Sequence, residues 1–165
     1  MEINYPKTNS GHDDSFRIGN EFADFVCITL AKDGIILQNI GTKKFQYETG
    51  ENLQGFEIKL DNRFNGLYPI DKPATNRLSI EIAEKSKGEN IKWISSGIYR
   101  GDNSWIYIHG NYKEFFVFSI TMLRLLHKSG RYEESESPQE KPTVRKFYLP
   151  IVDAYKYCAK NYKNN

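Results

Sequence analysis

Strict alternation of apolar and charged side chains in residues 56–61 is the feature that most limits how this chain can fold. The stretch reads FEIKLD, with an apolar residue at every second position. A β-strand turns successive side chains to opposite faces. The stretch therefore predicts a strand with one apolar face and one face that carries two carboxylates and a lysine. Either a solvated outer surface or an active site built on a strand accounts for that second face.

The same pattern recurs further along the chain and predicts more strands. Residues 78–85, LSIEIAEK, alternate in the same way, and residues 144–150, VRKFYLP, are rich in strand-forming residues. Short runs at 35–40 and 45–47 predict a strand pair or one bent strand, and residues 115–118 predict another strand. Gly101-Asp102-Asn103 and Gly110-Asn111 are typical of hairpin turns.

Helical spacing of apolar residues predicts three helices between and after these strands. The first spans Asp14 to about Lys32 and is closed by Gly34. A short second helix follows Ser119 or Thr121 and ends at Gly130. The third begins after Pro150 and carries a stripe made of Ile151, Tyr155, Cys158 and Tyr162. The order of elements indicates an α+β (or α/β) protein with one mixed central β-sheet flanked by helices.

Length and composition predict one domain spanning residues 1–165. The chain has 165 residues, long enough for one real core and short for two. We expect a mobile N-terminal arm at about 1–12 and a mobile acidic loop at about 130–142. No apolar run suits a bilayer span or a signal peptide, so the sequence predicts no membrane partner and a cytoplasmic protein. Two cysteines and three scattered histidines make a structural zinc site or a disulfide framework a poor interpretation.

Charge is informative through its distribution, because the net charge is only +2. The C-terminal segment interleaves lysines, among them Lys156 and Lys160, with tyrosines. Basic and aromatic side chains together suit the backbone and bases of a nucleic acid. A helix whose lysines simply face water is an equally good interpretation of the same pattern.

Acidic side chains gather on the predicted strands and suggest a metal. Glu57, Lys59 and Asp61 share one strand face, Glu81 belongs to the next strand, and Glu21 lies on a helix expected to pack nearby. Carboxylates brought together repel each other unless a divalent cation or an ammonium group lies among them. A cross-strand Lys59–Glu81 ion pair is the purely structural alternative.

Three segments in order carry a family resemblance. GFEIKLDNRF, LSIEIAEKS and SGIYRGDNSWIYIHG, together with a helix that bears a glutamate, resemble the PD-(D/E)xK nuclease superfamily. More specifically, they resemble a group of phage and bacterial proteins with the restriction-endonuclease-like fold, in which an EIK-D-R strand, an IEIAEKS strand and a SGIYR-DN-W-Y hairpin follow one another. The resemblance spans about Asn20 to Leu126.

By position, the resemblance implies catalytic roles for Glu21, Lys59, Asp61 and Glu81. Asp61, Glu81 and Glu21 would bind Mg²⁺, with Mn²⁺ as a substitute. Arg63, Arg77 and Arg100 flank the strands and, with Lys156 and Lys160, would contact DNA phosphates through forked or point charges.

The lysine of the motif departs from the family pattern, since Ala83 stands where a lysine is expected. Lys59 is on the same strand face as Asp61 and is the favoured substitute, and Lys85 is the other. In a rival register Glu57-Ile58-Lys59 is itself the E-x-K motif and Asp33 supplies the aspartate.

These features lead to the expectation of a Mg²⁺-dependent DNA endonuclease that acts in the cytoplasm of a bacterial or phage-infected cell. Because a duplex has two strands to cut, a homodimer is expected by analogy. Two alternatives stay open. One is a catalytically inactive nucleic-acid-binding or assembly protein with the same fold, and the other is a non-catalytic protein-interaction domain.

Overall fold

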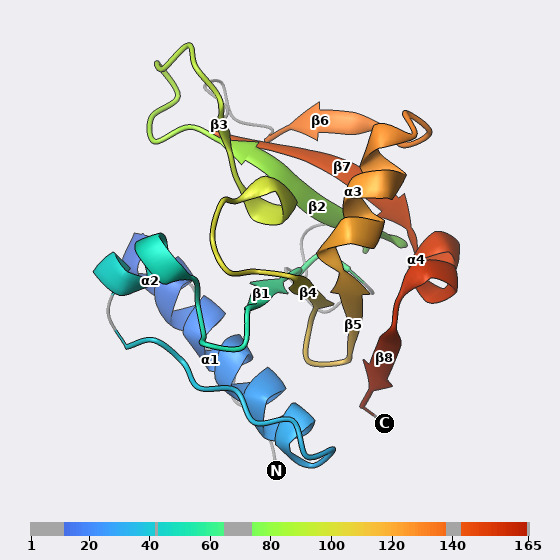
Figure 1. Cartoon of the computed structure of the whole chain (residues 1–165). Helices are drawn as coiled ribbons and strands as arrows, with labels where there is room; N and C mark the ends of the chain where they lie inside the picture. Colours follow the sequence, from blue (N-terminus) through green and yellow to red (C-terminus); the bar gives the residue numbers. More distant parts are fainter. Residues whose placement is uncertain (1–11, 42, 65–73, 138–142, 165) are drawn as a thin grey trace.

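The structure is a computed structural model that describes residues 12–41, 43–64, 74–137 and 143–164. It is a mixed α/β arrangement with two β-sheets and surrounding helices (Figure 1). The elements in chain order are α1 (His12–Ala31), α2 (Lys43–Thr49), β1 (Phe56–Leu60), β2 (Arg77–Glu84), β3 (Ile94–Ser95), the 3-10 turn η1 (Gly97–Tyr99), β4 (Ile106–Gly110), β5 (Glu114–Ser119), α3 (Ile120–Lys128), β6 (Glu134–Glu136), β7 (Val144–Pro150), α4 (Ile151–Tyr157) and β8 (Lys160–Lys163).

The first sheet contains β1, β4, β5 and β8 in that order. β1 is parallel to β4, with Glu57 beside Tyr107 and Lys59 beside His109, while β5 is antiparallel to both β4 and β8. The second sheet has the order β3, β2, β7, β6 and is antiparallel throughout. The α+β class is therefore confirmed, but the expectation of one central sheet is wrong, because the strands divide between two sheets.

Two apolar cores hold these layers together. One lies between α1 and the outer face of the first sheet, where Phe22, Val26 and Leu30 meet Ile58 and Ile108. The second core joins the inner face of the first sheet to the second sheet and α3, and includes Leu78, Ile80, Phe118, Leu123 and Phe147. α1 thus lies on one side of the first sheet and the second sheet lies on the other (Figure 1).

The inner face of β1 is where the second core stops being apolar. Phe56, Ile58 and Leu60 pack toward α1, so strand alternation turns Glu57, Lys59 and Asp61 toward the interior between the sheets. Glu57 is 1% exposed and Asp61 is 7% exposed. The polar face of this strand is therefore no solvated outer surface.

Several sequence-based element predictions are correct. The first helix, the strands at 56–60, 77–84 and 144–150, the short helix before Gly130 and the Gly110-Asn111 hairpin are all present. Other predictions are wrong. Residues 43–49 form a helix and no strand pair, Gly101–Asn103 is no hairpin turn, and the last helix stops at Tyr157 and gives way to β8. Part of the predicted acidic loop forms β6, while 138–142 and the arm at 1–11 lie outside the described residues.

No helix in the described ranges combines the length and the hydropathy that crossing a bilayer requires.

Candidate functional site

A buried polar cluster surrounds the ammonium group of Lys59. Its Nζ lies 3.0 Å from Oε1 of Glu57 and 3.6 Å from Oε1 of Glu51. The Lys59 side chain is 30% exposed, that of Glu51 26% and that of Glu57 only 1%. A fourth residue, Glu81, acts on Lys59 through its charge. We refer to Glu51, Glu57, Lys59 and Glu81 as the Lys59 cluster.

Three separate parts of the chain bring these side chains together. Glu57 and Lys59 come from the inner face of β1 and Glu81 from β2. Glu51 follows α2, and its Oε2 accepts a hydrogen bond of 3.0 Å from the Ile58 N–H, which fixes it along β1. Asn52 exchanges two hydrogen bonds with the backbone of Phe56, of 2.6 and 2.8 Å, and ties the same loop to the strand.

Glu81 is held by the segment that precedes η1. The Ser96 hydroxyl donates a short hydrogen bond to Oε1 of Glu81. Gly97 has φ 51°, and a Cβ at this position would lie 2.2 Å from the Glu81 carbonyl oxygen. Because a glycine here permits both the left-handed backbone and the close approach, the sequence Ser96-Gly97 positions Glu81 from outside the strand.

The electrostatics of the Lys59 cluster are dominated by carboxylates. Burial alone opposes the charge of Lys59, but Glu57, Glu51 and Glu81 together raise its pKa above the ordinary value. Burial raises the pKa of Glu51, an effect that Lys59 and the Ile58 N–H partly counteract. Neither oxygen of Glu57 receives a hydrogen bond of good geometry from the described residues, so the Lys59 ammonium is its compensating charge. Three carboxylates thus face one ammonium in a largely dehydrated place.

Tyr107 closes the inner side of the Lys59 cluster. Its ring is fully buried and its hydroxyl lies beside the backbone of Glu81. Burial and then the charge of Glu57 raise the pKa of this hydroxyl well above its ordinary value, so it stays protonated. Among the described residues the Tyr107 hydroxyl makes no hydrogen bond of good geometry, so it is a free donor beside these carboxylates.

Asp61 forms the centre of a hydrogen-bond network of its own. Its Oδ1 accepts hydrogen bonds from the backbone N–H groups of Arg63 and Phe64 at 3.2 Å each. Its Oδ2 accepts from the N–H and hydroxyl of Ser79 at 3.2 and 3.1 Å, and lies 3.0 Å from Nε2 of His109.

Burial would raise the pKa of Asp61, yet His109 and Ser79 outweigh it and lower the pKa to about 2. Both carboxylate oxygens of Asp61 are already engaged, and they join the end of β1 to Ser79 of β2. This arrangement suits a positioning residue better than the predicted metal ligand.

The other predicted catalytic residue lies elsewhere. Glu21 is on α1, has a 47% exposed side chain and forms an ion pair of 2.7 Å with Arg17. α1 packs against the face of β1 opposite to Lys59. The structure therefore does not bring Glu21 together with Asp61 and Glu81.

The predicted phosphate-binding residues are spread over different surfaces. Arg63 is exposed near Asp61, Arg77 pairs with Glu133 at 2.9 Å, and Arg100 lies 3.1 Å from Asp102 while donating to the Gln46 carbonyl. Lys156 lies on α4 and Lys160 pairs with Asp33 at 2.5 Å. β8 and β1 are opposite edges of the first sheet, so the two lysines are remote from the Lys59 cluster.

The two alternative lysine assignments can also be placed. Lys85 lies over the ring of Trp93 and donates to the Gly88 carbonyl, outside the Lys59 cluster. In the rival register, Glu57 and Lys59 do meet, but Asp33 is held by Lys160 and Tyr162 at the far edge. The E-x-K pair of that register is thus present in the site without its aspartate.

Sequence reasoning missed Glu51, Ser96 and Tyr107. Glu51 belongs to a loop and Ser96 to an irregular segment, so no periodicity marks either of them. The one available signal was the pairing of Glu57 with Lys59, which only the rival register used.

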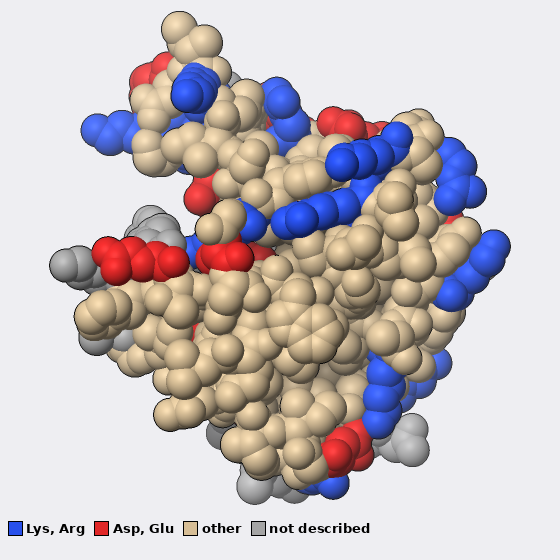
Figure 2. All heavy atoms as spheres, viewed as in Figure 1, with Lys and Arg blue, Asp and Glu red and all other residues tan. Residues whose placement is uncertain are grey.

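One side of the molecule carries a notch. Figure 2 shows a notch, on the side where α2 and the loop before β3 lie in Figure 1, between an upper and a lower part of the molecule. Acidic side chains are visible on its rim and basic side chains at its inner end.

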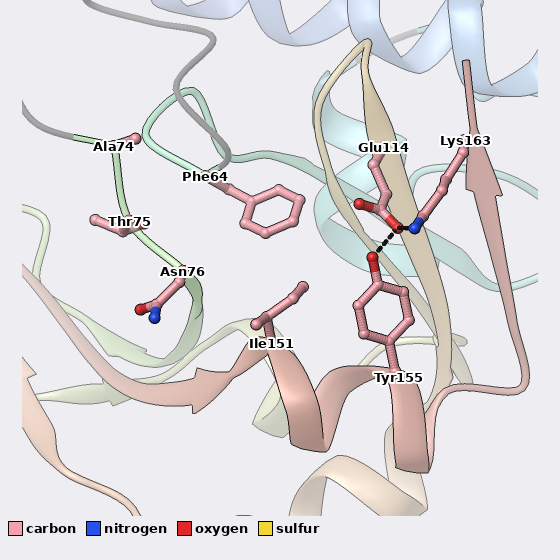
Figure 3. Close-up of a pocket in the computed structure, with 8 residues that line it drawn as sticks. All are labelled: Phe64, Ala74, Thr75, Asn76, Glu114, Ile151, Tyr155 and Lys163. Atoms are coloured by element: carbon pink, nitrogen blue, oxygen red, sulfur yellow. Dashed lines mark hydrogen bonds and ion pairs between the residues drawn. The ribbon is translucent and has the colours of Figure 1, made fainter. Parts of the chain in front are cut away.

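A second hollow lies beside Glu114, the first residue of β5. The pocket has a volume of about 490 Å³ and is lined by residues of β5, α4 and β8 and by Phe64 and Ala74–Asn76. Figure 3 shows Glu114 in its wall, with one oxygen facing Tyr155 and Lys163, at 2.6 Å and 3.6 Å. No member of the Lys59 cluster lines this pocket.

The donor chemistry of the Lys59 cluster suits a hard divalent cation. Carboxylate oxygens are the ligands that Mg²⁺ prefers, and Mg²⁺ usually takes only one or two of them together with substrate phosphates. The described residues contain no ready group of three or more histidine, cysteine, aspartate or glutamate side chains that could hold a metal by themselves. The oxygens of Glu57, which accept no hydrogen bond of good geometry from the described residues, are the feature that fits such an ion, with Glu81 as a companion ligand.

Comparisons with family models, with curated proteins and with solved structures found no match to this chain.

Proposed function

We propose that this protein is a metal-dependent DNA endonuclease of the PD-(D/E)xK type whose catalytic centre is the Lys59 cluster. The observation that carries the proposal is that two glutamates lie within 3.6 Å of one partly exposed lysine, on which the charge of Glu81 also acts. One of the two, Glu57, is buried and accepts no hydrogen bond of good geometry from the described residues. Perturbed charged groups of this kind are concentrated at functional sites. The restriction-endonuclease-like fold is part of the same proposal and is supported by the order of the three motif segments.

In this proposal the site residues have roles that follow from their charge. Glu57 and Glu81 would hold Mg²⁺ or Mn²⁺, and the bound ion would supply polarisation of the phosphodiester and a lowered pKa of a bound water. Lys59 supplies positive charge to the pentavalent phosphate as its negative charge develops. Glu51 orients Lys59, and Asp61 fixes β1 relative to β2. The E-x-K motif is then Glu57-Ile58-Lys59, with Glu81 as the second acid.

Cleavage of a duplex on both strands favours a homodimer, in which each protomer presents one Lys59 cluster. The enzyme acts on DNA in the cytoplasm of a bacterial or phage-infected cell.

One observation favours a second candidate function, a nucleic-acid-binding protein that does not hydrolyse its ligand. Lys59 already neutralises Glu57, and Asp61 is fully engaged by hydrogen-bond donors. Contacts of this kind also suit a purely structural role, in which the Lys59 cluster and Asp61 stabilise the junction of the two sheets. Cleavage is the property that separates the two functions.

The test is incubation of the protein with supercoiled plasmid and with branched DNA in Mg²⁺ or Mn²⁺. We expect cleavage by the wild type and a loss of about 100-fold or more in Glu57→Gln and in Glu81→Gln. Glu84→Gln is the matched control, because Glu84 is exposed and lies on the same strand as Glu81. Circular dichroism and thermal unfolding establish that the variants are folded.

Unchanged cleavage in both site variants would overturn the assignment of the centre. DNA binding with no cleavage under any of these conditions would favour the second candidate. If the protein neither binds nor cleaves DNA, a protein-interaction role is left, which no contact among the described residues supports specifically.

A further inference from the structure

We propose that the pocket beside Glu114 binds a free α-amino acid with an apolar side chain. Glu114 and Lys163 lie in its wall, together with the rings of Phe64 and Tyr155 (Figure 3). We refer to it as the Glu114 pocket. The inference does not rest on the proposed function, because no member of the Lys59 cluster lines this pocket.

The carboxylate of Glu114 is buried, and only one of its oxygens is engaged. The residue is 4% exposed. Its Oε1 accepts hydrogen bonds from the Tyr155 hydroxyl at 2.6 Å and from the Asn161 amide at 3.2 Å. Its Oε2 accepts none from the described residues, and Figure 3 shows this second oxygen turned toward the side of Phe64. A donor on a ligand can therefore form a charge-assisted hydrogen bond with Oε2.

Lys163 brings the opposite charge to the same place. It is paired directly with Glu114 across β5 and β8, and its Nζ lies 3.6 Å from Oε1 of Glu114. That distance is longer than a hydrogen bond, and an ammonium group has three donors, so Lys163 has donors left for an anionic group of a ligand. Its side chain is 58% exposed, which makes the ammonium reachable.

Two opposite charges this close together favour a ligand that also carries both charges. A ligand with only an ammonium group is attracted by Glu114 and repelled by Lys163, and a ligand with only a carboxylate meets the reverse. An α-amino acid carries both groups on a single carbon atom, so each of its charges can face the opposite charge of the pocket. The ligand ammonium donates to Oε2 of Glu114, and the ligand carboxylate accepts from Nζ of Lys163.

Much of the remaining wall suits an apolar side chain. Phe64, Ala74 and Ile151 line it together with the ring of Tyr155. The rings of Phe64 and Tyr155 both pack edge-on against Phe116, at centroid distances of 5.9 and 5.2 Å. The volume of about 490 Å³ is in the range of about 300–1,000 Å³ that is usual for small-molecule sites. The pocket therefore has room for the side chain of the amino acid as well as for its charged groups.

Hydrogen bonds hold the walls of the Glu114 pocket in place without a ligand. The N–H of Phe64 donates to Oδ1 of Asp61 at 3.2 Å, and the Phe64 carbonyl accepts from the Asn111 amide at 2.6 Å. The Ile151 N–H donates to the Asn76 carbonyl at 2.9 Å, which joins the start of α4 to the segment before β2. Binding to fixed walls costs less ordering free energy than binding to mobile ones.

The test is a titration of the isotope-labelled protein with L-phenylalanine, followed by amide-resolved NMR spectroscopy. We expect saturable shifts of the amide signals of Glu114, Tyr155 and Lys163. N-acetyl-L-phenylalanine lacks the ammonium group, and L-phenylalaninamide lacks the carboxylate. Each should bind at least about 10-fold more weakly than L-phenylalanine, because one of the two charge-assisted hydrogen bonds is lost.

Lys163→Gln and Lys160→Gln form a matched pair of variants. Both lysines belong to β8, lie over a tyrosine ring and have a carboxylate partner, but Lys160 does not line the pocket. We expect Lys163→Gln to bind L-phenylalanine about 10-fold more weakly. The same variant should bind L-phenylalaninamide no more weakly than the wild type does, because a repulsion is removed. Lys160→Gln should bind both ligands as the wild type does.

Glu114→Gln should also lose binding of L-phenylalanine, with thermal unfolding as the check that it is folded. If it does not fold, the ligand series and the two lysine variants decide the question. No saturable shift with L-phenylalanine, equal binding of N-acetyl-L-phenylalanine, equal losses in the two lysine variants, or tighter binding of cytidine, which offers an uncharged amino group, would each overturn the inference. DNA cleavage plays no part in this test, so its failure leaves the proposed function as it stands.

Discussion

At the scale of single residues, the Lys59 cluster joins stability to the proposed chemistry. Glu57 is 1% exposed and its carboxylate has the Lys59 ammonium as compensating charge at 3.0 Å. A buried charge that loses its partner costs far more free energy than the pair contributes as a whole. Whatever its catalytic value, Lys59 is therefore the charge that balances the buried Glu57 carboxylate.

Lys59→Met tests this dependence directly. We expect the variant to lose about 3–5 kcal/mol of unfolding free energy, because the Glu57 carboxylate is left unpaired. Lys59→Met/Glu57→Gln removes the orphaned charge as well and should regain most of the loss. Urea unfolding at pH 7 measures both variants. A double variant no more stable than Lys59→Met would contradict a compensating role for the ammonium.

Asp61 should make stability depend on pH in the acid range. Its pKa is about 2 in the folded protein against an ordinary value of 3.8. Because the folded value is the lower one, its contribution of about 2 kcal/mol is complete above about pH 4 and is lost as the pH falls toward 2. Asp61→Asn should remove this part of the pH dependence, as urea titrations between pH 2 and 5 would detect. Equal slopes in both proteins would exclude Asp61 as the source.

The sequence identified some of these residues and could not identify others. Alternation alone placed Glu57, Lys59 and Asp61 on one face, but alternation does not say whether that face meets water or the second sheet. The resemblance predicted Asp61 as a metal ligand, and the sequence could not show that Ser79 and His109 engage it, because they reach it from distant strands. Glu51 was missed because tertiary packing, and no local pattern, brings it to β1.

At the scale of elements, η1 acts on the site by pressing against β2. A Cβ on Gly97 would lie 2.2 Å from the Glu81 carbonyl oxygen and 2.8 Å from the Glu81 Cβ. The position of Glu81 therefore depends on η1 and on the residue just before it. That residue, Ser96, follows Glu81 by 15 positions and donates a hydrogen bond to its carboxylate.

Gly97→Ala should disturb Glu81 while leaving the rest of the fold intact. The left-handed backbone costs alanine about 1–2 kcal/mol, and the contact adds to this cost. We expect a lower melting temperature and reduced DNA cleavage. Gly101→Ala is the control, because a Cβ there meets nothing within 4 Å. Equal effects of the two substitutions would contradict a specific contact between η1 and Glu81.

The last helix was predicted too long for a reason that lies outside the local sequence. Tyr162 continues the apolar stripe of a helix, yet it lies on β8, where its ring stacks on Phe115 at 4.8 Å. The unpaired edge of β5 offers that strand a partner, and local propensity gives way to tertiary pairing. The strands with clear alternation, β1, β2 and β7, were predicted correctly because each has an apolar face that packs in a core.

At the scale of the whole molecule, the first sheet separates two environments. α1 covers the outer face of β1 with an apolar core, and the inner face carries the Lys59 cluster at the junction with the second sheet. Glu21 on α1 and the inward-facing Glu57 of β1 therefore lie on opposite sides of the first sheet.

Glu21→Gln and Glu51→Gln decide on which side of the first sheet catalysis takes place. Glu21 is exposed on α1, while Oε1 of Glu51 lies 3.6 Å from the Lys59 ammonium. We expect Glu21→Gln to leave plasmid cleavage in Mg²⁺ unchanged. Glu51→Gln should reduce it about 10–100-fold, as expected for a residue that orients a catalytic group. Both substitutions remove one carboxylate charge and preserve side-chain size, so net charge cannot explain a difference. A loss confined to Glu21→Gln would move the centre to the α1 side, because no path through the apolar core connects Glu21 to Lys59.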